Sequence, residues 1–115
     1  MTLQMDQTPR PPVGGITVVE HADRTTAQLW GEIDEAVRHE AEQALSRTVD
    51  RALPVVLDAG EVTFIDSTGV AFLIQFCTLG REEGLSVTLA DPPPAVSEVL
   101  DLLGLRRLFD PEDGD

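Results

Sequence analysis

The stretch VTFIDSTGVAFL, residues 62–73, contains two apolar runs that are separated by the polar segment Asp66–Gly69. The first run is typical of a β-strand. The second continues to about Glu83, is followed by Gly84, and is typical of an α-helix. Asp, Ser and Thr are the preferred residues at a helix N-cap, so one residue of the segment is expected to cap this helix. A cap needs only one polar residue, so a second interpretation is that the hydroxyl of Ser67 has a functional role.

A hydroxyl at the start of this helix would face the edge of a sheet, where the first helical N–H groups also point. A phosphate on Ser67 would lie near the positive end of the helix dipole and would add about −1.5 to −2 charges. The protein itself would tolerate that charge, whereas a docked partner would meet desolvation and like-charge repulsion. From the residues alone, a simple helix cap and a phosphorylation switch both remain open.

Upstream of this stretch, the sequence predicts a β-hairpin followed by an amphipathic helix. The hairpin strands are Ile16–Glu20 and Arg24–Trp30, both rich in strand-forming residues. Asp34 occupies the position of a helix N-cap. The apolar face of the helix that follows is expected to comprise Val37, Ala41, Ala44, Leu45, Thr48, Val49 and Ala52.

Short apolar strands alternate with helices through the rest of the chain. Residues 54–60 predict a buried strand with a turn at Ala59–Gly60, and residues 85–91 predict another. A helix over residues 92–104 has an apolar face of Val96, Val99, Leu100 and Leu103. Residues 105–110 are expected to form either a last strand or a short segment. This order predicts an α/β fold with a single mixed sheet of four or five strands, an opening hairpin and helices packed on the sheet.

The length of 115 residues fits a single domain. Residues 1–15 are expected to be a flexible leader, residues 16–110 the folded domain and residues 111–115 an acidic tail. The net charge is −13 and all eight basic residues are arginine. So acidic a surface disfavours nucleic acid and membrane as partners, and favours a basic protein partner. Without a signal peptide or a long apolar run, the expected location is the cytoplasm.

The sequence offers no constellation for catalysis. His21 and His39 have no neighbours at metal-ligand spacing, and the single cysteine, Cys77, lies in an apolar run and is expected to be buried. The serine-hydrolase elbow requires Gly-x-Ser-x-Gly, and Ile65 stands where its leading glycine would be. No active site can be assembled from these residues, so we expect a protein that is not an enzyme and requires no metal or cofactor.

Several motifs occur together in a recognisable order. They are GEID at residues 31–34, VVLDAGEVTFIDSTGV at residues 55–70 and PPPAVSEVLDLLGLRRLF at residues 92–109. This combination resembles the STAS domain and, more narrowly, the bacterial anti-sigma factor antagonists (anti-anti-sigma factors). The resemblance covers about residues 16–109, and it implies the STAS fold.

The resemblance also implies a mechanism of partner switching. In this family the serine that matches Ser67 is phosphorylated by the anti-sigma factor, a serine kinase of the GHKL ATPase type. The unphosphorylated antagonist binds that kinase and frees a sigma factor, the phosphorylated form does not bind, and a separate phosphatase resets it. Thr68 matches a minor alternative acceptor. The partner-binding switch surface is expected to comprise Asp34, Asp66, Ser67, Thr68, Gly69, Val70 and Leu73.

The sequence departs from the family pattern in two places. Val70-Ala71 replaces the Leu-Gly that commonly follows the motif glycine, which alters the surface beside Ser67. The chain also ends soon after Phe109, so the last C-terminal helix of the family is expected to be short or absent. The alternative to a switch is a STAS scaffold or subunit of a transport or stress-signalling complex that is not phosphorylated.

Overall fold

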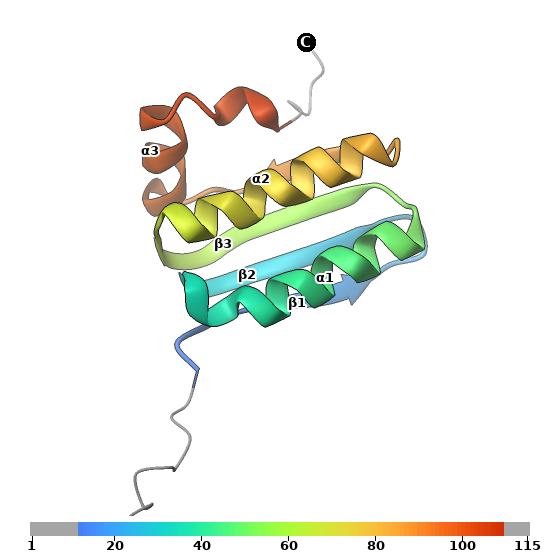
Figure 1. The fold of residues 1–115 in the computed structure, drawn as a ribbon, viewed down its shortest axis with the longest axis horizontal. Coiled ribbons are helices and arrows are strands. Elements are labelled where there is room, and N and C mark those ends of the chain that lie inside the picture. The colour runs from blue at the N-terminus through green and yellow to red at the C-terminus, as the bar shows by residue number, and fades with distance from the viewer. Residues whose placement is uncertain (1–11, 110–115) are drawn as a thin grey trace, which may run out of the picture.

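The computed structural model describes residues 12–109, which form one mixed sheet and its covering helices (Figure 1). The leader segment 1–11, the acidic tail and any helix after Phe109 lie outside the described residues. In chain order the elements are β1 (Gly14–Glu20), β2 (Thr25–Ile33), the 3-10 helix η2 (Glu35–Val37), α1 (Arg38–Arg51), β3 (Val55–Ile65), α2 (Ser67–Glu82), β4 (Val87–Ala90), α3 (Pro94–Leu102) and the 3-10 helix η3 (Arg106–Leu108). The predicted α/β class is confirmed.

The sheet has the strand order β1-β2-β3-β4. β1 and β2 form the predicted antiparallel hairpin, and β2–β3 and β3–β4 are parallel. Because the strand order advances in one direction and parallel crossovers are right-handed, both crossover helices must lie on the same face. Figure 1 shows α1 and α2 side by side over that face. β1 begins at Gly14, two residues inside the segment that we assigned to the leader.

The core lies between α1, α2 and the sheet. Paired residues such as Ala27 and Leu57 point toward the helices, where they are fully buried. Their neighbours in β2 and β3, among them Gln28 and Glu61, point to the opposite face and are exposed. This alternation is the period-two pattern of strands with one buried face. Cys77 is buried in the core, as predicted.

The predicted turn at Ala59–Gly60 is wrong, because β3 continues through it to Ile65. Between the pairs Gln28–Asp58 and Trp30–Glu61, β3 contributes one residue more than β2 does. The Asp58 carboxylate accepts a hydrogen bond from the N–H of Gly60 at 3.0 Å. The glycine and the aspartate that suggested a turn therefore form a β-bulge, which keeps the strand paired.

Of the two alternatives for residues 105–110, the last strand is wrong and a short segment is found. Residues 106–108 form η3, and Phe109 is buried. The Cys77 thiol on α2 donates a hydrogen bond to the carbonyl oxygen of Leu108 at 2.6 Å. The apolar residues Leu105, Leu108 and Phe109 are three and four positions apart, which is helical spacing rather than the alternation of a strand.

Two residues that we expected on apolar helix faces are exposed. Ala52 is the C-cap of α1 in the left-handed conformation, with φ of 57°, and Leu103 follows the last residue of α3 and is 53% exposed. Both lie where a helix ends, so the helical periodicity no longer directs their side chains inward. Val96 and Leu100 of the same predicted α3 face are buried.

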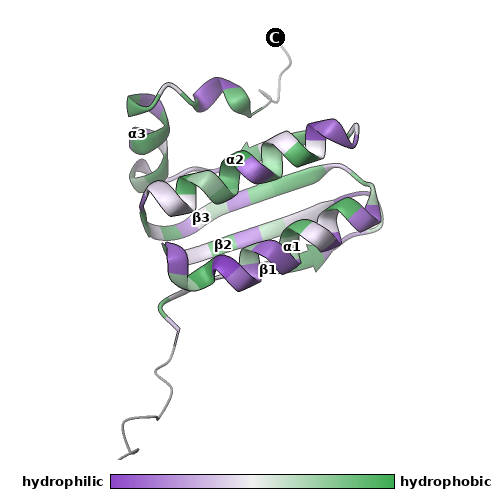
Figure 2. Ribbon diagram, in the orientation of Figure 1, coloured by the Kyte–Doolittle hydropathy of each residue, from purple (hydrophilic) through white to green (hydrophobic). Residues whose placement is uncertain are grey.

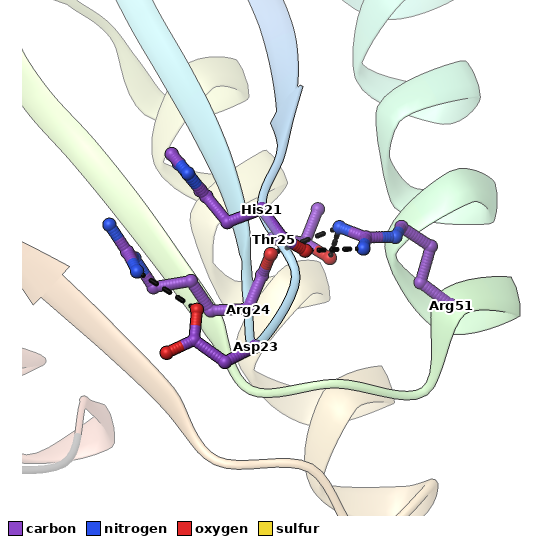
Figure 3. A network of polar contacts seen from close by, with 5 residues as sticks. All are labelled: His21, Asp23, Arg24, Thr25 and Arg51. Carbon is purple, nitrogen blue, oxygen red and sulfur yellow. Dashed lines mark hydrogen bonds and ion pairs between the residues drawn. The ribbon is translucent and has the colours of Figure 1, made fainter.

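Arg51, at the end of α1, ties the β1–β2 turn to the helix layer (Figure 3). Its guanidinium donates hydrogen bonds to the carbonyl oxygens of Arg24 (3.0 Å) and His21 (2.6 Å) and to Oγ1 of Thr25 (2.9 Å). Thr25 is fully buried. One side chain thus satisfies three acceptors of the turn and fixes the end of the hairpin that lies near the C-terminal end of α1.

We expect Arg51→Ala to lower the free energy of unfolding by about 1.5–3 kcal/mol, because charge-assisted hydrogen bonds are lost and the acceptors on His21 and Thr25 lose their donor, whereas the Arg24 carbonyl still accepts from the N–H of His21. Urea unfolding followed by circular dichroism measures the change. Arg47→Ala is the matched control: Arg47 forms an ion pair with Glu20 in which both side chains are about half exposed, and its removal should cost less. Equal losses in the two variants would contradict the role given to Arg51.

Candidate functional site

The segment Asp66–Gly69 joins the end of β3 to the start of α2, and Asp66 is the residue that caps the helix. Its backbone is extended (φ −112°, ψ −171°), and its carboxylate accepts a hydrogen bond from the N–H of Gly69 at 2.9 Å. The cap that was expected within this segment is therefore Asp66 and not Ser67. Ser67 already has helical geometry as the first residue of α2, so its hydroxyl stands one position too late to cap.

Ser67 is exposed, and among residues 12–109 its hydroxyl takes part in no hydrogen bond. Thr68, beside it, is only half exposed. The first N–H groups of α2 lie beside Ser67, at the positive end of the helix dipole. The hydroxyl of Ser67 is thus accessible and free of a structural task.

Gly69 holds the end of β2 against the start of α2. A Cβ at this position would lie 2.2 Å from the carbonyl oxygen of Ile33 and 2.7 Å from Cγ1 of Ile65, which is closer than atoms can approach. That carbonyl also accepts a hydrogen bond from the N–H of Asp66 at 3.4 Å. The glycine is needed because the backbone of one element packs where its side chain would be.

This contact brings Asp34 to the same edge as Asp66 and Ser67. Asp34 directly follows Ile33, has an extended backbone and is half exposed. Its carboxylate accepts a hydrogen bond from the N–H of Ala36 at 3.0 Å, so it caps the 3-10 turn η2, which precedes α1. The edge lies at the carboxyl ends of the parallel strands β2 and β3, which is where open α/β sheets place their functional residues.

Three residues of the expected partner-binding surface are not on the surface. Gly69 is buried, and Val70 and Leu73 are 3% and 1% exposed. They lie on the side of α2 that packs against the sheet, so an apolar side chain after the motif glycine serves the core rather than a partner. Ala71, which is exposed, and Ile74, which is half exposed, occupy the outward side instead.

Sequence reasoning missed a cationic group near the start of α1. The Arg38 guanidinium lies over the ring of Phe72 on α2, 5.4 Å from the ring centroid. It also donates two hydrogen bonds to the Glu35 carboxylate, at 2.6 and 2.8 Å. The hydrogen bond from Arg38 lowers the pKa of Glu35 and raises the pKa of Arg38. The three-residue spacing of Glu35 and Arg38 was the available signal.

In residues 12–109, no group of three or more His, Cys, Asp or Glu side chains is placed to hold a metal ion. No helix within the same residues has both the length and the apolar character needed to cross a membrane.

A mixed four-stranded sheet that is covered on one face by two crossover helices is the fold of a known class of domain. The family model of the STAS domain matches residues 16–113. The chain therefore belongs to the STAS domain family, as its motifs indicated.

Solved structures with this fold include anti-sigma factor antagonists. One from Mycobacterium paratuberculosis is 30% identical, with 82% of this chain and 80% of that chain covered and a TM-score of 0.67. The anti-sigma factor antagonist SpoIIAA is 19% identical in its unphosphorylated form, with 82% and 84% covered and a TM-score of 0.64. Its phosphorylated form from Bacillus has a TM-score of 0.62, with 82% and 87% covered.

RsbS from Moorella thermoacetica is 23% identical, with 82% of each chain covered and a TM-score of 0.70. At these lower identities, SpoIIAA and RsbS establish the fold alone.

The assignment of the cap predicts different stabilities for two neighbouring substitutions. Asp66→Ala should lower the free energy of unfolding by about 1 kcal/mol, because an N-cap is lost. Ser67→Ala should change it by less than about 0.5 kcal/mol, because an exposed hydroxyl without a partner is removed. Urea unfolding of both variants, with Asp66→Asn as a control that keeps a capping oxygen, makes the comparison. A loss for Ser67→Ala as large as that for Asp66→Ala would restore Ser67 as the cap.

The Glu35–Arg38 pair predicts a pH dependence. Since folding lowers the pKa of Glu35, the pair stabilises the fold above the unfolded pKa, and this contribution is lost as the pH falls through the folded pKa. In Arg38→Gln the pKa of Glu35 should rise toward its ordinary value, as measured by NMR titration of the carboxyl carbon. Glu20, whose pKa is lowered by Arg47, is the internal control and should not change. An unchanged pKa of Glu35 would refute the coupling.

Proposed function

We propose that this protein is an anti-sigma factor antagonist that acts by binding and catalyses no reaction itself. Its unphosphorylated form binds an anti-sigma factor, which is a serine kinase of the GHKL ATPase type, and a sigma factor is released. Phosphorylation of Ser67 by that kinase ends binding, and a phosphatase restores it. The exchange takes place in the cytoplasm between proteins, without direct contact with nucleic acid or membrane.

Two comparisons support this proposal. The structures of similar fold include proteins described as anti-sigma factor antagonists, one of them 30% identical to this chain. SpoIIAA has been solved in an unphosphorylated and a phosphorylated form, so a protein of this fold accepts the modification.

The observation that carries the proposal is the separation of cap and hydroxyl at the start of α2. Asp66 caps the helix, and Ser67 is exposed with a hydroxyl that has no partner within the described residues. A kinase can therefore modify Ser67 without disturbing the helix. Thr68 is less exposed, which favours Ser67 as the main acceptor and Thr68 as the minor one.

Electrostatics explains how one phosphate would end binding without unfolding the protein. The phosphate adds about −1.5 to −2 charges, and the helix N-terminus stabilises a negative group at this position. The same edge already carries the carboxylates of Asp34 and Asp66. A partner that closes over this edge would have to desolvate the added charge and would lose the hydroxyl contact. The modification thus acts on the complex and spares the free protein.

We expect Ser67→Ala to retain full affinity for the anti-sigma factor and Ser67→Glu to bind it at least a hundredfold more weakly, because about 3 kcal/mol of coupling corresponds to that factor. The partner is first identified by capture from the native cell lysate with wild-type protein, followed by mass spectrometry. Calorimetric titration of the purified partner then gives the dissociation constants.

Ser46→Glu is the matched control, because it makes the same change at an exposed serine on α1. It should bind like wild type. Equal losses for Ser46→Glu and Ser67→Glu would show a general effect of net charge, and full affinity of verified phospho-Ser67 protein would refute the switch. If wild-type protein and Ser67→Glu, used as parallel baits in the lysate, retain the same transport or scaffold proteins, a constitutive STAS subunit is favoured instead.

A further inference from the structure

A groove of about 410 Å³ runs between α1 and α2 on the outer side of the helix layer. We call it the α1–α2 groove. It is lined by Glu42, Leu45, Ile74, Gln75, Thr78, Leu79 and Glu82. Leu45, Ile74 and Leu79 are partly buried, and each keeps some apolar surface in contact with water that a partner could cover. The groove is therefore a place where burial by a partner would be favourable.

No charged residue lies on the outward side of α2 between Ser67 and this groove. Residues 67–80 contain no Asp, Glu, Lys or Arg, although a quarter of the whole chain is charged. Ser67, Ala71, Gln75 and Thr78 are all exposed, and their spacing of three and four residues places them along one side of the helix. Figure 2 shows α2 as apolar or neutral along most of its length, whereas α1 is largely hydrophilic. The side chains of this stripe are neutral and, apart from Gln75, small, so a partner can approach the helix closely.

The charges at the groove are of one sign. The lining includes the carboxylates of Glu42, on α1, and Glu82, on α2, and it includes no basic residue. The chain as a whole carries a net charge of −13, which disfavours a second copy as the occupant. An apolar floor between acidic rims matches a helix with an apolar stripe that is flanked by arginine or lysine.

We propose that the α1–α2 groove binds a basic amphipathic helix of the anti-sigma factor, continuous with the contact at Ser67. The inference rests on the proposed function and names the feature of the partner that the groove recognises. The part of α2 that lines the groove runs from Ile74 to Glu82, or about 12 Å, and α2 as a whole spans 16 residues, or about 24 Å, so a partner helix of about four turns would cover both the groove and the Ser67 end. The switch at Ser67 would then control one end of a longer interface.

The chemistry of the groove is tested with a defined probe. The probe is a synthetic 18-residue peptide with leucine at helical spacing and arginine on both flanks, and a matched peptide carries glutamate in place of arginine. Titration of the arginine peptide into ¹⁵N-labelled protein should shift the amide signals of Leu45, Ile74 and Thr78 in a saturable way. Signal changes spread over the whole surface, or equal binding of the glutamate peptide, would overturn the proposal.

Two variants and a matched control sharpen this test. Glu42→Arg should weaken peptide binding roughly fivefold, because one rim charge is reversed. Glu40→Arg makes the same change at an exposed α1 residue that does not line this groove, and it should alter binding less than twofold. Thr78→Arg places bulk and positive charge in the groove and should weaken binding more than tenfold. Equal effects of Glu42→Arg and Glu40→Arg would show unspecific attraction and overturn the proposal.

Binding of the anti-sigma factor that the wild-type bait retains is then compared between Ser67→Glu and Thr78→Arg, which distinguishes this proposal from the proposed function. If Ser67→Glu loses that partner and Thr78→Arg binds it like wild type, the switch stands and the groove proposal is overturned. If Thr78→Arg loses a partner that Ser67→Glu retains, the groove proposal stands and the switch fails. Loss with both variants supports a single interface. Circular dichroism of each variant confirms that the fold is intact.

Discussion

The close contact between Gly69 and the carbonyl of Ile33 is the constraint on which the functional edge depends. It is a contact between two backbones, and it sets the distance between the end of β2 and the first turn of α2. Asp34 follows directly on one side of the contact, and Asp66 and Ser67 precede it on the other. The elements behind this edge are fixed by the buried core, since α2 packs Phe72, Phe76 and Cys77 inward. The side chain of Ser67 is therefore exposed at the start of a helix whose neighbouring residues are held in place.

The division of tasks between Asp66 and Ser67 follows from their places one residue apart. A capping side chain must keep its oxygen on the backbone N–H groups, so it is not free to react or to be modified. A residue at the first helical position has no such duty, and its side chain points to solvent unless packing intervenes. The segment therefore places a structural carboxylate and an accessible hydroxyl side by side, and a covalent change at the second leaves the first in place.

Much of the architecture could be predicted from the sequence because local patterns and global packing agree. The alternation of strands and helices after the hairpin was sufficient to predict the mixed sheet. Residue type alone predicted that Asp34 is a cap and that α2 ends before Gly84. The failures have physical causes. The bulge at Gly60 uses residues typical of a turn, and the spacing of Leu108 and Phe109 is helical although the segment is short.

The candidate site was predicted only in part. Asp34, Asp66 and Ser67 meet at one edge because of topology, whereas Val70 and Leu73 are buried because α2 turns that side to the sheet. Sequence spacing shows which residues share one side of a helix. When most of the helix is apolar, it does not show which side packs on the sheet and which side is exposed to a partner. The contact of Arg38 with Phe72 joins two helices that are far apart in the chain, so no local pattern indicates it.

The extra residues of β3 have a consequence for how the length of this chain can vary. Relative to β2, β3 carries one surplus residue between Asp58 and Glu61 and another between Val62 and Phe64. Loss of a single residue at either place would restore regular pairing and leave the residues beyond it on their present faces. The same loss within the regular segment 55–58 would reverse the faces of the residues between it and the first bulge, where buried residues such as Leu57 lie. The bulges thus mark where insertions and deletions are compatible with an intact edge at Asp66.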